Sequence, residues 1–149
     1  PAPYWCIATH TRGPSPSLAC AEASFPGALL SGTASVFTHK QGVLLVVYDV
    51  ESPKPLHKQY AIEFNCGIAL VLMPSQSENT LAKLDINFQS RKTEEMDMVL
   101  SPPLLKLISG NASAQPLRML SAVASQDSRE IFYDYLENSA VEVKVNPCN

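Results

Sequence analysis

Cysteine is the residue type in this chain with the most readily interpreted chemistry, and it occurs at Cys6, Cys20, Cys66 and Cys148. Cys148 is the second-to-last residue, and a thiol there adds little to a core because chain ends fray unless something holds them. A disulfide bond is the usual means, so the sequence predicts an oxidising compartment. Four cysteines allow three pairings. We favour Cys6–Cys20 with Cys66–Cys148, which ties down both ends, followed by Cys6–Cys148 with Cys20–Cys66.

Zinc binding and thiol catalysis are the alternative uses of these cysteines. Cys6, His10 and Cys20 are possible zinc ligands, but zinc sites usually combine two close pairs of ligands and this chain has one. We therefore expect neither a metal nor another cofactor. Cys66 lies in the apolar segment 64–68, where a thiol is expected to be buried and inert rather than activated.

Other residues capable of chemistry form no recognisable site. Glu94, Glu95 and Asp97 could assist glycoside hydrolysis or bind Ca²⁺, but the calcium-loop pattern is absent and such a charged run is typical of a solvated turn. A serine–histidine–aspartate triad is assembled in space, so a hydrolase stays an alternative although the G-x-S-x-G elbow is missing. The histidines share no metal-binding spacing and fall in expected loops or strand ends: His10, His39 and His57.

The size and charge of the chain exclude several classes of protein. Its 149 residues predict one globular domain, 1–149, in which residues 1–30 form an irregular N-terminal segment packed on a β core. The net charge of −3, without a basic stripe, argues against nucleic acid as a partner. No stretch of 18 apolar residues is present, so no membrane span is expected. No signal peptide precedes the domain, and we interpret the sequence as a mature or trimmed form from which it was removed.

Hydrophobic alternation predicts a mainly β domain. The segment 43–50 is a β-branched run bounded by Gly42 and Ser52, typical of a strand buried on both faces. The segment 141–145 alternates strictly, as a half-buried strand does. Further strands or strand-like alternation are expected at 32–40, 59–64, 67–73, 81–88, 96–100, 117–123 and 130–136.

Two segments permit either secondary structure. Residues 101–108 could form a short helix capped by Ser101 or an extended edge. Residues 128–140 are predicted as strand, because three aromatic residues and an isoleucine suit a pleated surface, with a helix capped by Asp127 as the alternative. The fold class predicted is an antiparallel β-sandwich or barrel-like domain with at most one or two short helices, reinforced by disulfides.

Because no catalytic signature stands out, the sequence predicts a non-catalytic recognition domain, secreted or periplasmic, that binds another protein. Inhibitor, immunity and receptor-binding roles all fit, and the chain is not expected to be an enzyme. The alternatives are a structural subunit of a surface assembly or adhesin, a hydrolase whose active site is not readable from sequence, and a carrier of a small apolar ligand.

Two patches are the predicted partner-binding residues. Tyr4 and Trp5 adjoin Cys6, whose disulfide would anchor them, and anchored aromatic residues are favoured at interfaces. The second patch is the small, polar loop 109–113, represented by Ser109, Gly110 and Asn111, which is flexible enough to enter a cleft of the partner. Asn111 also begins an Asn-Ala-Ser glycosylation pattern.

Overall fold

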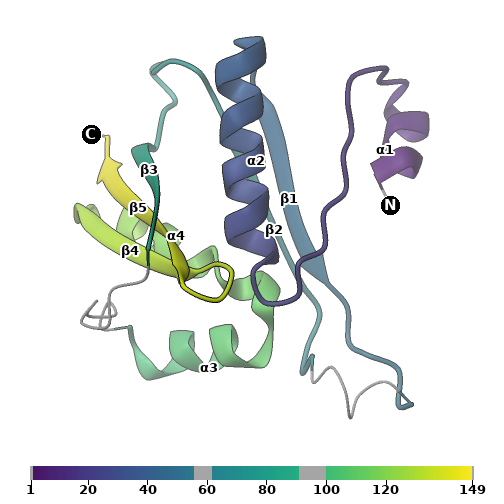
Figure 1. Cartoon of the computed structure of the whole chain (residues 1–149), viewed down its shortest axis with the longest axis vertical. Helices are drawn as coiled ribbons and strands as arrows, with labels where there is room; N and C mark the ends of the chain where they lie inside the picture. Colours follow the sequence, from purple (N-terminus) through teal and green to yellow (C-terminus); the bar gives the residue numbers. More distant parts are fainter. Residues whose placement is uncertain (1, 56–61, 91–99, 149) are drawn as a thin grey trace.

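The structure, a computed structural model, describes residues 2–55, 62–90 and 100–148 and shows a mixture of helices and strands (Figure 1). The predicted β-sandwich is wrong, because the strands form two small separate sheets with helices against them. The helices are α1 (Ala2–Thr9), α2 (Ser24–His39), α3 (Pro102–Gly110), the short 3-10 helix η1 (Ala112–Ala114) and α4 (Leu117–Ser125). The strands are β1 (Val43–Asp49), β2 (Cys66–Leu72), β3 (Ala82–Ser90), β4 (Arg129–Asp134) and β5 (Ser139–Pro147).

The first sheet is a two-stranded antiparallel ribbon of β1 and β2, paired from Val43 opposite Leu72 to Asp49 opposite Cys66. Side chains alternate between its two faces along each strand. One face, which includes the buried Val47, is covered by α2, while alternate positions on the other face are exposed. The expectation that 43–50 forms a strand is confirmed, but the strand is covered on one face only.

The second sheet is three-stranded and antiparallel, in the order β3-β5-β4. The central strand, β5, buries Val141, Val143 and Val145 completely on one face. On the opposite face the Lys144 ammonium lies 2.8 Å from a carboxylate oxygen of Glu130 in the neighbouring strand. This is the alternation that 141–145 predicts, so that strand is confirmed.

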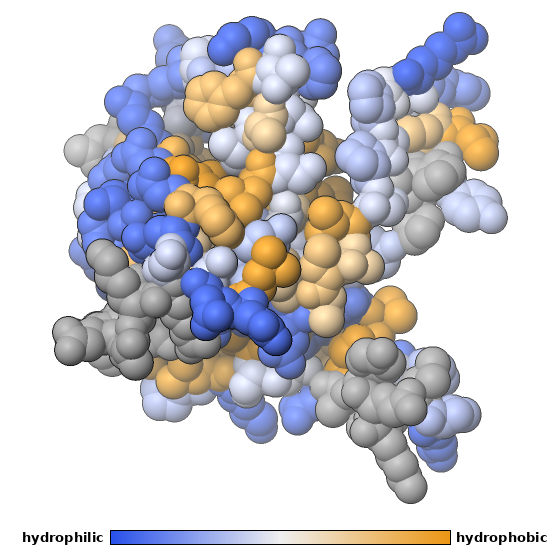
Figure 2. Space-filling model, viewed as in Figure 1, coloured by the Kyte–Doolittle hydropathy of each residue, from blue (hydrophilic) through white to orange (hydrophobic). Residues whose placement is uncertain are grey.

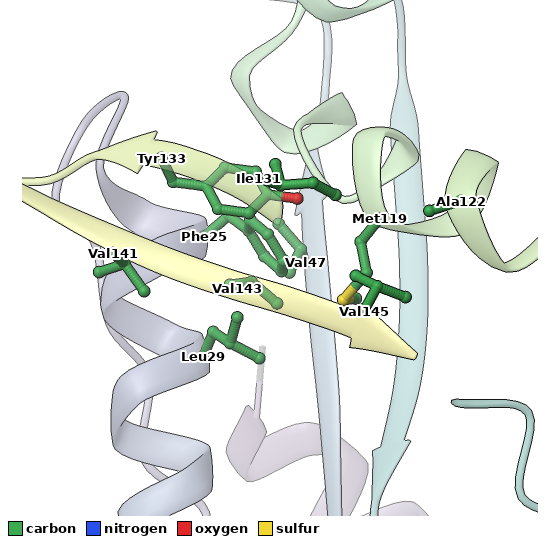
Figure 3. Close-up of a cluster of buried hydrophobic side chains, with 10 residues drawn as sticks. All are labelled: Phe25, Leu29, Val47, Met119, Ala122, Ile131, Tyr133, Val141, Val143 and Val145. Atoms are coloured by element: carbon green, nitrogen blue, oxygen red, sulfur yellow. The ribbon is translucent and has the colours of Figure 1, made fainter. Parts of the chain in front are cut away.

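An apolar core of described residues joins the two sheets through α2, which stands between them in Figure 1. The rings of Phe25 and Tyr133 meet edge to face, with centroids 5.0 Å apart. Aromatic pairs prefer this geometry. Figure 3 shows how α2, β1, α4, β4 and β5 all contribute side chains to this cluster. Its buried members are Phe25, Leu29, Val47, Met119, Ala122, Ile131, Tyr133, Val141, Val143 and Val145.

Two predicted strands are helices. The segment 32–40 belongs to α2, whose buried Phe25, Leu29 and Val36 recur at helical spacing that only becomes visible when the segment is taken from residue 24. The segment 117–123 is α4, which buries Met119 and Ala122, three positions apart, instead of alternate residues. The region predicted to be irregular, 1–30, likewise contains α1 and the start of α2.

Several other secondary-structure expectations from the sequence are confirmed. The strands predicted at 67–73, 81–88 and 130–136 are β2, β3 and β4, so the segment 128–140 contains a strand and not the alternative helix. The alternative of a short helix at 101–108 is confirmed by α3, which has proline in its first turn. Part of the strand expected at 59–64 and most of that at 96–100 lie outside the described residues, and 62–64 are not in a strand.

Candidate functional site

A group of polar side chains gathers where β1 ends and β2 begins, against η1. We call Asp49, Cys66, Asn111 and Ser113 the Asp49 cluster. Asp49 and Cys66 are directly opposite each other in the β1–β2 ribbon. Asn111 and Ser113 belong to the turn between α3 and α4, and both are buried. Because buried polar groups are costly unless they are hydrogen-bonded, their partners define what the cluster does.

Hydrogen bonds join the turn at η1 to the last residue of β1 and to the segment just before β2. The Ser113 hydroxyl donates to a carboxylate oxygen of Asp49 at 2.6 Å. The Asn111 side-chain amide donates to the Phe64 carbonyl oxygen at 2.7 Å, and its own oxygen accepts from the Ser113 backbone N–H at 2.8 Å. The Glu63 backbone N–H also donates to the Gly110 carbonyl oxygen, at 3.0 Å. The cluster therefore holds the α3–η1 turn against the segment that leads into β2.

The same surroundings disfavour ionisation of the Cys66 thiol. Burial raises the pKa of the Cys66 thiol, and the negative charge of Asp49 raises this pKa further. The thiolate is the reactive form of cysteine, so a raised pKa leaves little of it at neutral pH. The raised pKa is in line with the low reactivity expected for this thiol, but Cys66 is partly rather than fully buried.

We predict that alkylation of Cys66 by iodoacetamide reaches half of its maximal rate at a higher pH than alkylation of a cysteine in a short peptide. The reason is the raised pKa of the thiol. Tryptic cleavage after the lysines and arginines places each of the four cysteines on a different peptide, so mass spectrometry can follow Cys66 separately in the full chain.

The shape of the pH profile, rather than the absolute rate, is the relevant quantity, because limited access alone slows alkylation equally at every pH. Asp49→Asn retains an oxygen that accepts from Ser113 but removes the charge, and should move the Cys66 profile toward lower pH while leaving Cys20 unaltered. A Cys66 profile identical to that of the peptide would contradict this account of the thiol.

The disulfides expected from the sequence are not formed. All four cysteines are free thiols: Cys20 is exposed, and Cys6, Cys66 and Cys148 are partly buried. Cys6 lies on α1, Cys66 begins β2, and the Cys148 sulfur accepts a long hydrogen bond of 3.7 Å from the Gln76 amide. The C-terminal end is instead held by backbone pairing, since the Cys148 N–H donates to the Leu81 carbonyl oxygen at 2.9 Å.

The two predicted partner-binding patches lie in contrasting surroundings. Tyr4 and Trp5 are exposed on α1, without the disulfide that was to anchor them. Ser109 is exposed at the end of α3, but Gly110 and Asn111 are buried. The loop 109–113 is therefore not a flexible probe for a cleft in a partner, and the buried Asn111 side chain cannot serve as a glycan acceptor in the folded chain.

Among the described residues, no group of three or more histidine, cysteine, aspartate or glutamate side chains is arranged to hold a metal ion. His10 and His39 are exposed. His57 and the acidic group Glu94, Glu95 and Asp97 lie outside the described residues. No helix in the described parts of the chain has both the length and the apolar character needed to cross a membrane.

Sequence reasoning did not single out Asp49 or Ser113. Asp49 follows a long apolar run and Ser113 is one of many serines, 64 positions away along the chain. The one available signal was a carboxylate interrupting the apolar stretch 43–50, in a strand expected to be buried. A buried carboxylate requires a hydrogen-bonding partner, but the pattern does not say which residue supplies it.

Comparison with known families gives a match over most of the chain. The family model described as beta-ketoacyl synthase, N-terminal domain, matches residues 2–129, from α1 to the first residue of β4. Neither a curated protein nor a solved structure matches the chain.

This match corrects the predicted function. Beta-ketoacyl synthases are condensing enzymes of the fatty-acid and polyketide synthase type, so a non-catalytic recognition domain, and the expectation that the chain is not an enzyme, are wrong. The match likewise does not support the inhibitor, adhesin or hydrolase alternatives. Members of the family are typically cytoplasmic, against the secreted or periplasmic placement. The chain belongs to the family of the beta-ketoacyl synthase N-terminal domain, because the match covers well over half of its 149 residues.

Proposed function

We propose that this chain acts in carbon–carbon bond formation between acyl thioesters, as a domain of a fatty-acid or polyketide synthase-type condensing enzyme. The observation that carries the proposal is the family match over residues 2–129. These residues include α1 to α4, both strands of the β1–β2 ribbon and the whole Asp49 cluster. The match therefore involves α2, β1 and α4, which supply half of the buried core, as well as the elements that build the candidate site.

The reaction joins two acyl units. A β-ketoacyl product forms when the α-carbon of one acyl thioester attacks the carbonyl carbon of another and the thiol of the second leaves. A malonyl thioester supplies that carbon nucleophile when it loses CO₂, so the products are a β-ketoacyl thioester, CO₂ and a free thiol. Enzymes commonly hold the acyl group on an accessible, activated side chain before such a step.

Within this reaction we assign the Asp49 cluster a positioning role. The Ser113 hydroxyl is buried and directed to Asp49, and the Cys66 thiol is kept protonated by burial and by the same carboxylate. Neither group has the combination of access and ionisation that accepting an acyl group requires. The cluster instead fixes the α3–η1 turn relative to β1 and β2.

The test is condensation by the full chain. Purified protein is incubated with an acyl thioester and a malonyl thioester, and the β-ketoacyl thioester is measured by mass spectrometry against a heat-denatured sample. We expect product with the folded chain, and the same rate with Cys66→Ser, since Cys66 is not the acyl carrier.

The two parts of the proposal fail separately. Absence of product above the denatured control, with wild-type protein that circular dichroism shows to be folded, contradicts the condensing function of this chain. Product that depends on Cys66 leaves the function in place and contradicts only the positioning role of the cluster.

A further inference from the structure

The outward face of the β1–β2 ribbon is apolar, and no described helix or strand covers it. Its cross-strand pairs are Leu44 with Val71, Val46 with Ala69, and Tyr48 with Gly67, and none carries a charge. Leu44, Val46, Tyr48 and Val71 are between 49% and 67% exposed. A contiguous exposed apolar patch of this kind marks an interaction site, and strands that are apolar on both sides normally have both faces of their sheet covered.

The helix α1 also exposes apolar side chains to solvent. It contains no charged residue, and its Tyr4, Trp5 and Ile7 side chains are 60–77% exposed. In Figures 1 and 2 it stands apart from the rest of the chain, on the other side of β1 from α2, with apolar residues on its surface. A helix that is apolar on all sides is typical of a buried one, and one of eight residues has little stability in water without tertiary packing.

The segment that joins α1 to α2 allows the two surfaces to meet. Residues 10–22 are all exposed. Extended chain spans up to about 3.3 Å per residue, so the linker 10–23 reaches about 46 Å, roughly twice the length of β1. A short flexible tether also gives its two ends an effective concentration in the millimolar range, which favours α1 over a second copy of the chain at micromolar protein concentration.

We propose that α1 closes on the outward face of the β1–β2 ribbon as an intramolecular strap. The ribbon is then covered by α2 on one face and by α1 on the other. The aromatic side chains of Tyr4 and Trp5 lie over the aliphatic pairs around Leu44 and Val46, and the Tyr48 hydroxyl stays at the edge in water. The driving force is removal of apolar surface from water on both partners.

The position of Trp5 provides a direct test, because it is the single tryptophan of the chain. Acrylamide quenching of its fluorescence is measured for the full chain at several protein concentrations. We expect quenching severalfold weaker than for a short tryptophan peptide, and independent of protein concentration. Leu44→Lys places a charge on the docking face and should restore quenching to the level of the peptide.

Leu105→Lys is the matched control, since Leu105 lies on α3 and both leucines are 50% exposed. It should leave the quenching of Trp5 unaltered. Peptide-like quenching in the wild-type chain, or protection that survives Leu44→Lys, overturns the proposal. Protection that grows with protein concentration also overturns it and assigns the face to a second copy of the chain.

A second measurement does not depend on the stability of a lysine variant. A photo-crosslinking amino acid at position 71 should form its main cross-link to the tryptic peptide that ends at Arg12 and carries α1. We expect this product within monomeric protein. Cross-links confined to other peptides, or found only in dimers, contradict closure of α1 on the ribbon.

Discussion

Phe25→Ala is expected to lower the free energy of unfolding by about 3–5 kcal/mol, the range for removal of a buried phenylalanine side chain. Phe25 is 1% exposed and packs edge to face on Tyr133, at the point where α2 meets the three-stranded sheet. The substitution removes apolar burial and the aromatic pair and leaves a cavity. For a domain of this size the loss corresponds to a fall in melting temperature of about 10 °C, measurable by calorimetry or circular dichroism.

Phe37→Ala is the matched control on the same helix. Phe37 is 63% exposed, and its one described ring contact is the Lys40 ammonium, 5.6 Å from the centroid. Its replacement should alter the free energy of unfolding by less than about 1 kcal/mol. Equal effects of the two substitutions would mean that α2 does not present this face to the core.

Asn111→Ala should have the second largest effect, a loss of about 2–4 kcal/mol in the free energy of unfolding. The side chain of Asn111 is buried and binds the Phe64 carbonyl oxygen and the Ser113 N–H. Alanine leaves both backbone groups without these partners, and a buried polar group left unsatisfied costs about 1–3 kcal/mol. Urea denaturation of the full chain measures the difference.

Asn87→Ala tests whether the burial of Asn111, rather than its residue type, causes the effect. Asn87 is exposed on β3 and donates to Glu142 at 3.2 Å. Its removal should alter the free energy of unfolding by no more than about 0.5 kcal/mol. If Asn111→Ala is equally mild, the hydrogen bonds of the Asp49 cluster do not hold the α3–η1 turn.

The strands show how much secondary structure the local sequence pattern predicts. The segments 141–145 and 43–50 indicate strands from the sequence alone. Side chains in a strand alternate between its faces, so burial of one face appears as alternation in 141–145, and the β-branched run of 43–50 is typical of a strand. The helix α2 is not evident from the sequence, because its pattern of buried residues needs a longer window than a strand does. Its buried residues are spaced at helical intervals across Ser24–His39, and a window that begins at residue 32 contains too few of them.

The enzyme family also lay beyond a search for motifs. The likeness to the family extends over residues 2–129, whereas a motif must be strong over a few positions. No short pattern in this chain is of that kind, and the four cysteines pointed to disulfides and a secreted protein instead. Cysteine count alone does not distinguish a thiol near a chain end from a disulfide-bonded one, and the structure keeps all four thiols free.

By itself, the sequence determined the positions of the strands β1, β2, β3, β4 and β5. Strand positions depend on the pattern of neighbouring residues along the chain. Only the tertiary structure decided that the strands form two sheets, that α2 stands between them, and that Asp49 meets Ser113. Those outcomes depend on contacts between residues far apart in the chain, and a pattern of side chains shows that a group must be buried or paired without showing against what.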